Sequence, residues 1–166
     1  MQSYSYVMEK AEDAFEGLIE FYRGDGLTYT DLDGNTSQIP IYKGFSLEDL
    51  TGTRIEVIAT AAEPERLGAM PDGGYMTGNY RVTITVTVAS CRTESDRNEH
   101  KGRAGIIGDI FMRSALEDDI GNLENLDNFT VWKPGWMPGQ CQRMTDGDEI
   151  ITQFSGVLYC APGGDE

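Results

Sequence analysis

The sequence lacks the features that identify membrane and secreted proteins. Its longest uninterrupted apolar stretches are only a few residues, far short of the ~18 that a membrane-spanning helix needs. Residues 1–6 contain no basic region followed by an apolar core, so no secretory signal is expected. We therefore expect a protein that folds where it is made and has no membrane partner.

Cysteine and histidine are too few and too scattered to indicate a metal or catalytic site. Cys91, Cys141 and Cys160 are an odd number with no C-x₂-C pair, which predicts free thiols in a reducing compartment, each with a small core or strand role. The single histidine, His100, has polar and charged neighbours, which predicts an exposed surface side chain. Cys91 is near it in sequence, but no third group is evident to orient a Cys–His pair. We predict no catalytic residue, no metal ligand and no cofactor.

Motifs for phosphate, nucleotide and calcium sites are also missing. No G-x-x-x-x-G-K-[ST], G-x-S-x-G or G-x-G-x-x-G pattern occurs. The stretch 31–35 (DLDGN) begins like a calcium loop, but Thr36 stands where glycine is required and Tyr42 where glutamate is required. This stretch and residues 146–148 (DGD) are typical of turns between strands. The sequence therefore favours a protein that is not an enzyme.

Acidic residues are in large excess. The 28 aspartates and glutamates against 13 lysines and arginines give a formal net charge of −15 at pH 7. Such a surface repels duplex DNA, and no stripe of basic residues reverses this locally, so a nucleic-acid-binding protein is not expected. The charge either maintains solubility or suits a channel through which DNA slides without sticking.

Apolar residues recur at helical spacing in two segments. Residues 7–22 carry an apolar side and an acidic side, which predicts an amphipathic helix. A second helix is predicted to begin after Ser95 or Asp96, with Glu99 completing a capping box, and to run to about Asp119. Its predicted apolar face consists of Ala104, Ile106, Ile107, Ile110, Phe111, Ala115 and Leu116.

Alternating and β-branched residues predict strands at residues 39–42, 54–62, 80–90, 129–132 and 150–160. In the third of these, valine or isoleucine alternates with arginine or threonine over residues 81–88, as in a long half-buried strand. The first is expected at a sheet edge because Pro40 cannot donate to a ladder. Gly156, inside the last strand, is expected to mark a bulge.

Two long segments are predicted between strands, at residues 63–79 and 133–149. Hairpin loops are usually two to five residues, so the first is either a partner-binding arm or a loop that folds back on its own domain. Trp132 and Trp136 suggest one core tryptophan and one anchor at a protein interface, where tryptophan and methionine are enriched. The interface residues predicted in these segments are Met70, Tyr75, Met76, Trp136 and Met137.

The element order is α-β-β-β-α-β-β, without an internal repeat or a linker. It predicts a single α+β domain over residues 1–166, with a mainly antiparallel sheet and both helices packed on one face. This order, together with residues 79–86 (NYRVTITV) and 99–110 (EHKGRAGIIGDI), resembles the tail terminator (tail completion) proteins of tailed bacteriophages. In that family an N-terminal helix precedes a hairpin, a helix crosses the sheet, and a last pair of strands closes it. Segments 63–79 and 133–149 are longer here than in the family.

The resemblance implies a virion structural protein at the head–tail junction, assembled in the host cytoplasm. It implies a homohexameric ring that docks on the tail tube protein, halts polymerisation and contacts the head–tail connector or neck protein. We expect the acidic surplus on the ring lumen, through which DNA passes. A cyclic ring needs two different faces on each subunit. Besides the loop residues named above, the interface residues predicted on the long strand are Thr83, Thr85 and Thr87.

Two alternatives remain at the level of the sequence. One is another neck or head–tail joining protein or a tail-tube subunit, which would stack into long polymers instead of stopping at a ring. The other is a small-molecule or carbohydrate-binding module that uses Trp132, Trp136 and Tyr75 as a platform.

Overall fold

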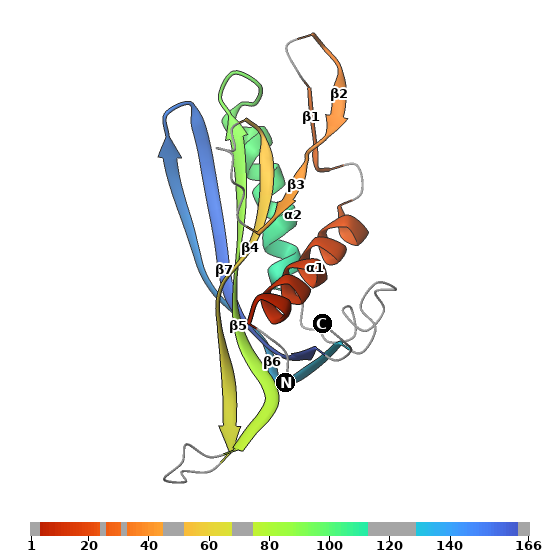
Figure 1. Cartoon of the computed structure of the whole chain (residues 1–166). Coiled ribbons are helices and arrows are strands. Elements are labelled where there is room, and N and C mark those ends of the chain that lie inside the picture. Colours follow the sequence, from red (N-terminus) through yellow and green to blue (C-terminus); the bar gives the residue numbers. More distant parts are fainter. Residues whose placement is uncertain are drawn as a thin grey trace.

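The alternating segment around residues 80–90 forms the central strand of the fold. The computed structural model describes residues 4–23, 26–30, 33–44, 52–67, 75–112 and 129–162. In it the central strand is β5 (Tyr75–Cys91), which pairs antiparallel with β4 (Arg54–Leu67) on one side and β7 (Glu149–Pro162) on the other. β3 (Ile41–Lys43) and β6 (Phe129–Asp146) complete the five-stranded sheet in the order β3-β4-β5-β7-β6 (Figure 1).

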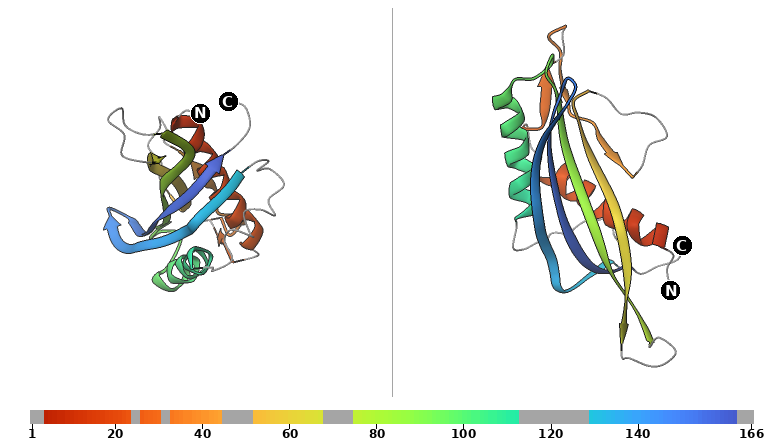
Figure 2. Two further views of the ribbon diagram at one scale, coloured as in Figure 1. Left: turned by 90° about the horizontal axis from the view of Figure 1, so that it is seen from below. Right: turned by 90° about the vertical axis from the view of Figure 1, so that its left-hand side faces the viewer.

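Both long helices pack on one face of this sheet, as predicted (Figure 2). Helix α1 (Tyr4–Tyr22) lies against β4 and β5, and helix α2 (Arg97–Phe111) lies against β5 and β7. Of the strands that the structure describes, only β3 is parallel to its neighbour, β4. The predicted α+β class and element order are therefore confirmed, with one addition. A small separate hairpin, β1 (Thr28–Thr30) with β2 (Thr36–Gln38), lies between α1 and β3 in the sequence.

The start of α2 has the predicted capping box. Asp96 is the N-cap, and its Oδ1 accepts from the Glu99 backbone N–H at 2.8 Å, while the Glu99 side chain accepts from the Asp96 N–H at 3.2 Å. Each carboxylate thus satisfies a helix-terminal donor that has no partner within the helix. None of the helices in the described ranges is long and apolar enough to cross a membrane.

The core lies between the sheet and the helices. The apolar residues of β5 at positions 82, 84, 86 and 88 are all fully buried, as their alternation predicts. Aromatic rings from three elements meet above them: the ring centroid of Phe15 lies 5.6 Å from that of Phe111 and 4.8 Å from that of Trp136. Phe154 joins this cluster at 5.5 Å from Phe111. The cluster fixes both helices against the closing strands.

A buried carboxylate also joins α1 to the sheet. The Glu12 side chain is 8% exposed, and its Oε2 accepts from the Ala59 backbone N–H at 2.9 Å, next to a register shift in β4. Burial raises the pKa of Glu12, and the hydrogen bond from Ala59 partly opposes this rise. The bond satisfies a strand N–H at the point where the ladder is interrupted.

The prediction that residues 133–149 connect two strands is wrong. This part of the chain is itself strand: β6 continues to Asp146 and turns through Gly147, at φ +58°, directly into β7. Its prolines and glycines suggest a loop, but β6 is an edge strand, where residues without an N–H are tolerated. Two register shifts along β6 accommodate them. The predicted turn at 146–148 is confirmed.

The prediction of a 63–79 loop is wrong at both ends of the segment, residues 63–67 and 75–79, for a similar reason. Pairing between β4 and β5 continues past Pro64, which lies opposite Tyr80 beside a register shift, as far as Leu67 opposite Tyr75. The hairpin projects well beyond the helices (Figure 1). Residues 68–74, including Met70, lie outside the described ranges.

Helix α2 ends at Phe111 and not near Asp119. Met112 leaves the helical conformation at φ −90° and ψ 4°. The Trp136 indole Nε1 donates to the Phe111 carbonyl at 2.6 Å, which satisfies one of the carbonyls that a helix end leaves without a partner. The predicted apolar positions Ala115 and Leu116 lie outside the described residues.

Candidate functional site

The side of the sheet turned away from both helices is here called the outer face. No described helix covers it (Figure 2). Strand pairing aligns one row across it, made of Ala61, Thr83, Val157 and Met137. The adjacent row is made of Ile58, Thr85 and Ser155. The outer face is therefore a mixed surface of small hydroxyl and aliphatic side chains.

Four of the predicted interface residues belong to the outer face. Thr83 and Thr85 are half-buried, and Met137 is 48% exposed although a large apolar side chain is usually covered. Thr87 is buried, and its Oγ1 accepts from the Gln153 Nε2 at 3.2 Å. Met137, from a segment predicted as a loop, thus lies in the same row as Thr83.

The remaining predicted interface residues lie elsewhere. Trp136, predicted at the interface, instead lies on the helix side of the sheet, where its ring packs against Phe15 and Phe111. Tyr75 and Met76 occupy the first positions of β5, opposite Leu67 and Arg66. Of Trp136 and Met137, only Met137 belongs to the outer face.

A buried polar network lies beneath the N-terminal half of α2. His100, predicted as a surface residue, is only 4% exposed. Its Nδ1 lies 2.8 Å from Ser90 Oγ on β5 and its Nε2 lies 2.8 Å from Thr152 Oγ1 on β7. Arg103 donates to the same Ser90 oxygen at 3.0 Å and to Ser95 Oγ at 2.6 Å. The surface prediction is wrong because hydroxyls from distant strands satisfy both ring nitrogens.

The surroundings of His100 favour the neutral form of its ring. Burial, together with the positive charges of Arg103 and Arg143, lowers the pKa of His100. Because Arg103 already donates to Ser90, the Ser90 hydroxyl can donate to Nδ1, which leaves Nε2–H to donate to Thr152. Ser90 is fully buried, so this Ser–His contact holds the fold together and offers no approach for a substrate.

The lowered pKa of His100 makes the free energy of unfolding depend on pH in a defined direction. Between the folded pKa and the unfolded value of 6.5, the unfolded chain binds more protons than the folded chain. We expect the contribution of His100 to the free energy of unfolding to be complete above pH 6.5 and to decrease as pH falls toward the lowered pKa. His100→Gln should remove this part of the pH dependence of stability. The contribution of Glu12, whose raised pKa makes stability change with pH in the opposite direction, should remain.

The measurement is direct because the chain has one histidine. An NMR titration of its ring protons gives the folded pKa without assignment ambiguity, and urea unfolding at several pH values gives the stability. A folded pKa at or above 6.5 would contradict the buried neutral network.

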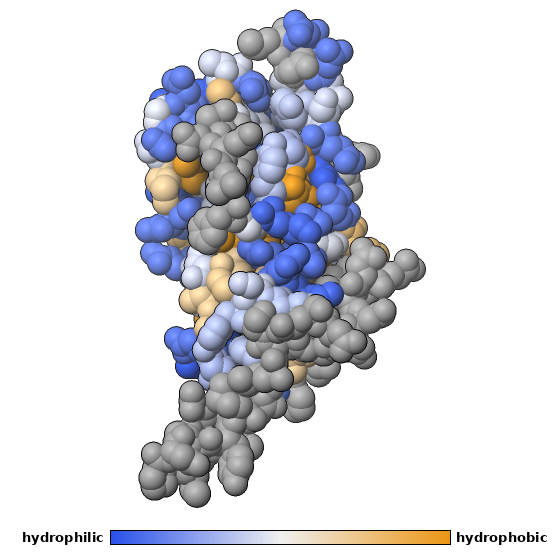
Figure 3. Space-filling view, in the orientation of Figure 1, coloured by the Kyte–Doolittle hydropathy of each residue, from blue (hydrophilic) through white to orange (hydrophobic). Residues whose placement is uncertain are grey.

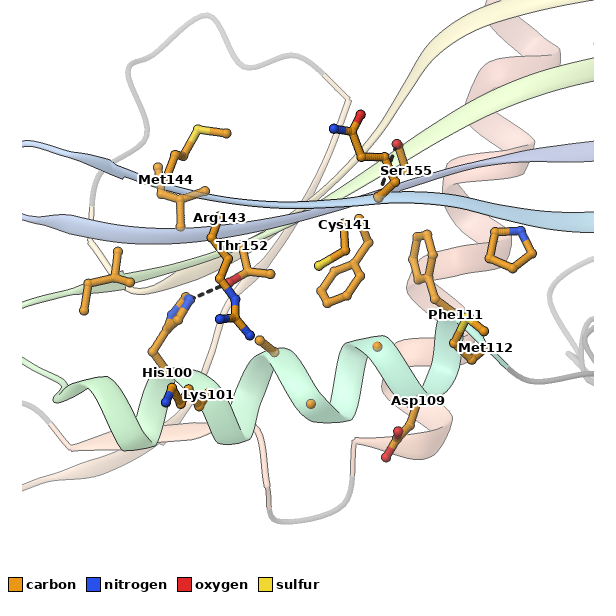
Figure 4. Close-up of a pocket in the computed structure, with 18 of the residues that line it drawn as sticks. His100, Lys101, Asp109, Phe111, Met112, Cys141, Arg143, Met144, Thr152 and Ser155 are labelled. Atoms are coloured by element: carbon orange, nitrogen blue, oxygen red, sulfur yellow. Dashed lines mark hydrogen bonds between the residues drawn. The ribbon is translucent and has the colours of Figure 1, made fainter.

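A groove of about 970 Å³ runs between α2 and the β6–β7 hairpin (Figure 4). Arg97, Lys101 and Arg143 line one part of it, and all three side chains are exposed. Arg143 reaches from β6 toward α2, whereas Asp109 points away from the sheet (Figure 4). Arg97 and Lys101 are one helical turn apart, but nothing in the sequence places Arg143 beside them until the register of β6 is known.

The cysteines are free, as predicted. Cys91 is half-buried, Cys141 is exposed at the groove, and Cys160 is buried in β7, where desolvation raises the pKa of its thiol to about 12. Among the described residues, no group of three or more His, Cys, Asp or Glu side chains is placed to hold a metal ion. No protein-family model matches the sequence, and no curated protein matches it significantly.

Proposed function

We propose that this chain is a virion structural protein, the ring-forming tail terminator of a tailed phage. Copies of it cap the tail tube, stop tube polymerisation and join the tail to the neck. The observation that carries the proposal is the two-sided architecture: helices cover one face of the sheet and leave the outer face open (Figure 2). A ring requires two different surfaces on each subunit, and this architecture supplies them.

The outer face has the composition of a subunit contact. Its threonines and Ser155 can be desolvated at less cost than lysine or glutamate, and Met137 supplies an exposed apolar side chain. In the orientation of Figure 1, the described residues present a mostly hydrophilic surface with small separate apolar patches (Figure 3). Non-obligate protein interfaces are about as apolar as the rest of the protein surface.

The β4–β5 hairpin is a second supporting feature. It extends past the helices (Figure 1) and can therefore reach a neighbouring ring or the tube. The acidic surplus suits a lumen through which DNA slides, and a ring map with a neutral or basic lumen would argue against that part of the proposal.

The structural role is preferred over a carbohydrate-binding module. That alternative needs Trp136 as a platform, but the indole is engaged by Phe15, Phe111 and the Phe111 carbonyl. A tube subunit, the same-class alternative, would polymerise without limit. Electron microscopy of the assembled protein separates a ring from a polymer.

The test is native mass with and without purified tail tubes. We expect a hexamer, or a monomer that forms one ring at each tube end. Met137→Glu, on the outer face, should abolish the ring while leaving thermal unfolding within about 1 °C, because the side chain is half-exposed. Tyr4→Glu is the matched control, since it also replaces an exposed large apolar residue by glutamate but lies on α1. A wild-type monomer that ignores tubes would contradict the proposal.

A further inference from the structure

Cations without partners gather in the groove between α2 and the β6–β7 hairpin. Five of the ten basic side chains that the structure describes form ion pairs within the chain. These pairs are Lys43–Asp13 (2.6 Å), Arg54–Glu149 (2.6 Å), Arg23–Glu20 (2.9 Å), Arg103–Glu99 (3.7 Å) and Arg81–Glu63. Arg97, Lys101 and Arg143 are exposed and form no ion pair with any residue in the described ranges.

The fold brings these three side chains to one end of the groove. Arg97 and Lys101 lie in the first two turns of α2. Arg143 lies opposite Thr152 in the sheet. The Thr152 hydroxyl is in turn hydrogen-bonded to His100 of α2. The N-terminal end of a helix carries positive partial charge, so Arg97 and Lys101 do not stabilise α2 by their position. Their placement instead concentrates positive potential in a protein of net charge −15.

No other described residue that lines the groove neutralises this end. His100 is neutral, and the Asp109 side chain points away from the sheet (Figure 4). The remaining lining is largely apolar and includes Phe154 and Met112, the latter 71% exposed. The groove is therefore cationic at one end and largely apolar along the rest of its length. Its chemistry is complementary to a segment of chain that carries carboxylates beside apolar side chains.

We propose that this groove binds an acidic segment of a second copy of the chain. The inference rests on the proposed function and specifies where copies meet. Copies of charge −15 repel one another, so association requires a local region of opposite charge, and the groove supplies one. A second copy offers exposed carboxylates, among them Glu9, Asp146 and Asp148, that form no ion pair within the described part of the chain.

The same charges fix the geometry of the contact. Two grooves cannot face each other, because their cations would repel. The groove of one copy therefore meets a different surface of the next, and this heterologous contact repeats around a ring instead of closing a two-fold dimer. The groove lies on the helix side of the sheet, opposite the outer face, so the two surfaces can serve two neighbours at once.

The first experiment is zero-length crosslinking of carboxylates to amines in a mixture of light and ¹⁵N-labelled protein. It is done on the assembled wild type, free or on tube ends. We expect Lys101 to join a carboxylate in a peptide pair of mixed isotope content, which only a contact between copies produces. Lys101→Arg should assemble normally and lose only this link, because it keeps the charge and removes the amine. Links from Lys101 only within one copy would overturn the inference.

The second experiment reverses the charges. Lys101→Glu/Arg143→Glu should weaken assembly by about tenfold or more, because like charges now meet at the contact, while Lys101→Arg/Arg143→Lys should assemble as the wild type does. Raising the salt to about 0.5 M should weaken the wild type and leave the reversed variant less affected. Equal assembly of the reversed variant and the wild type would overturn the inference and leave the proposed function standing. Absence of any wild-type ring, free or on tubes, would overturn both.

Discussion

Replacing Phe15 by alanine is expected to lower the free energy of unfolding by about 3–5 kcal/mol. Phe15 is fully buried and is the residue of α1 that touches both Phe111 of α2 and Trp136 of β6. Its removal takes away the buried area of the ring and leaves a cavity where three elements meet. The measurement is urea unfolding followed by far-ultraviolet circular dichroism at constant pH.

The control is Phe21→Ala in the same helix. Phe21 is 70% exposed, and its ring contact is with the neighbouring Tyr22. We expect it to cost less than about 1 kcal/mol, in line with other exposed substitutions. If the two variants lost equal stability, the aromatic cluster would not be the contact that holds α1 to the closing strands.

Gly156→Ala is expected to lower the free energy of unfolding by about 2–3 kcal/mol. A Cβ at this position would lie 2.3 Å from Trp136 Cη2 and 2.8 Å from the Met137 carbonyl oxygen. The carbonyl belongs to the β6 backbone, so the strain cannot be relieved by a rotamer change alone. Either the indole leaves its site against Phe15 or the two strands separate locally. A shift in tryptophan fluorescence should accompany the loss of stability.

Gly102→Ala is the matched control. Gly102 lies on the exposed side of α2, and an added Cβ would meet nothing within 4 Å. Alanine there is expected to raise stability by about 1 kcal/mol, since it reduces the conformational entropy of the unfolded chain in a helical position. Loss of stability in both variants would show that glycine is required for backbone conformation and not for the approach of Trp136.

The sequence predicts most of the fold because its strongest patterns are local. The alternation in β5, the amphipathic spacing of α1 and the capping box at Asp96 each specify an element from consecutive residues. The two segments read as loops, 63–79 and 133–149, fail for the same reason. Their prolines and glycines are loop signals locally, but strand pairing extends over residues 63–67, 75–79 and 133–146.

The candidate site is less predictable because its parts are distant in the chain. The burial of His100 depends on hydroxyls from β5 and β7, and the cationic end of the groove depends on Arg143 lying in register with Thr152. Spacing along α2 places Arg97 and Lys101 together, but no pattern in one sequence gives the third charge. The threonines of β5, in contrast, reach the outer face because strict alternation fixes their side.

The two edges of the sheet affect how readily the protein aggregates in concentrated solution. The strand at one edge, β3, has only three residues. The strand at the other edge, β6, contains Pro134 and Pro138 and has two register shifts. Proline cannot donate a backbone hydrogen bond to an incoming strand, and an irregular edge strand does not align with a regular one. The addition of further strands, and so growth into fibrils, is thus disfavoured at the β6 edge. This property is compatible with the proposed terminator, which would end the growth of another polymer without starting one of its own.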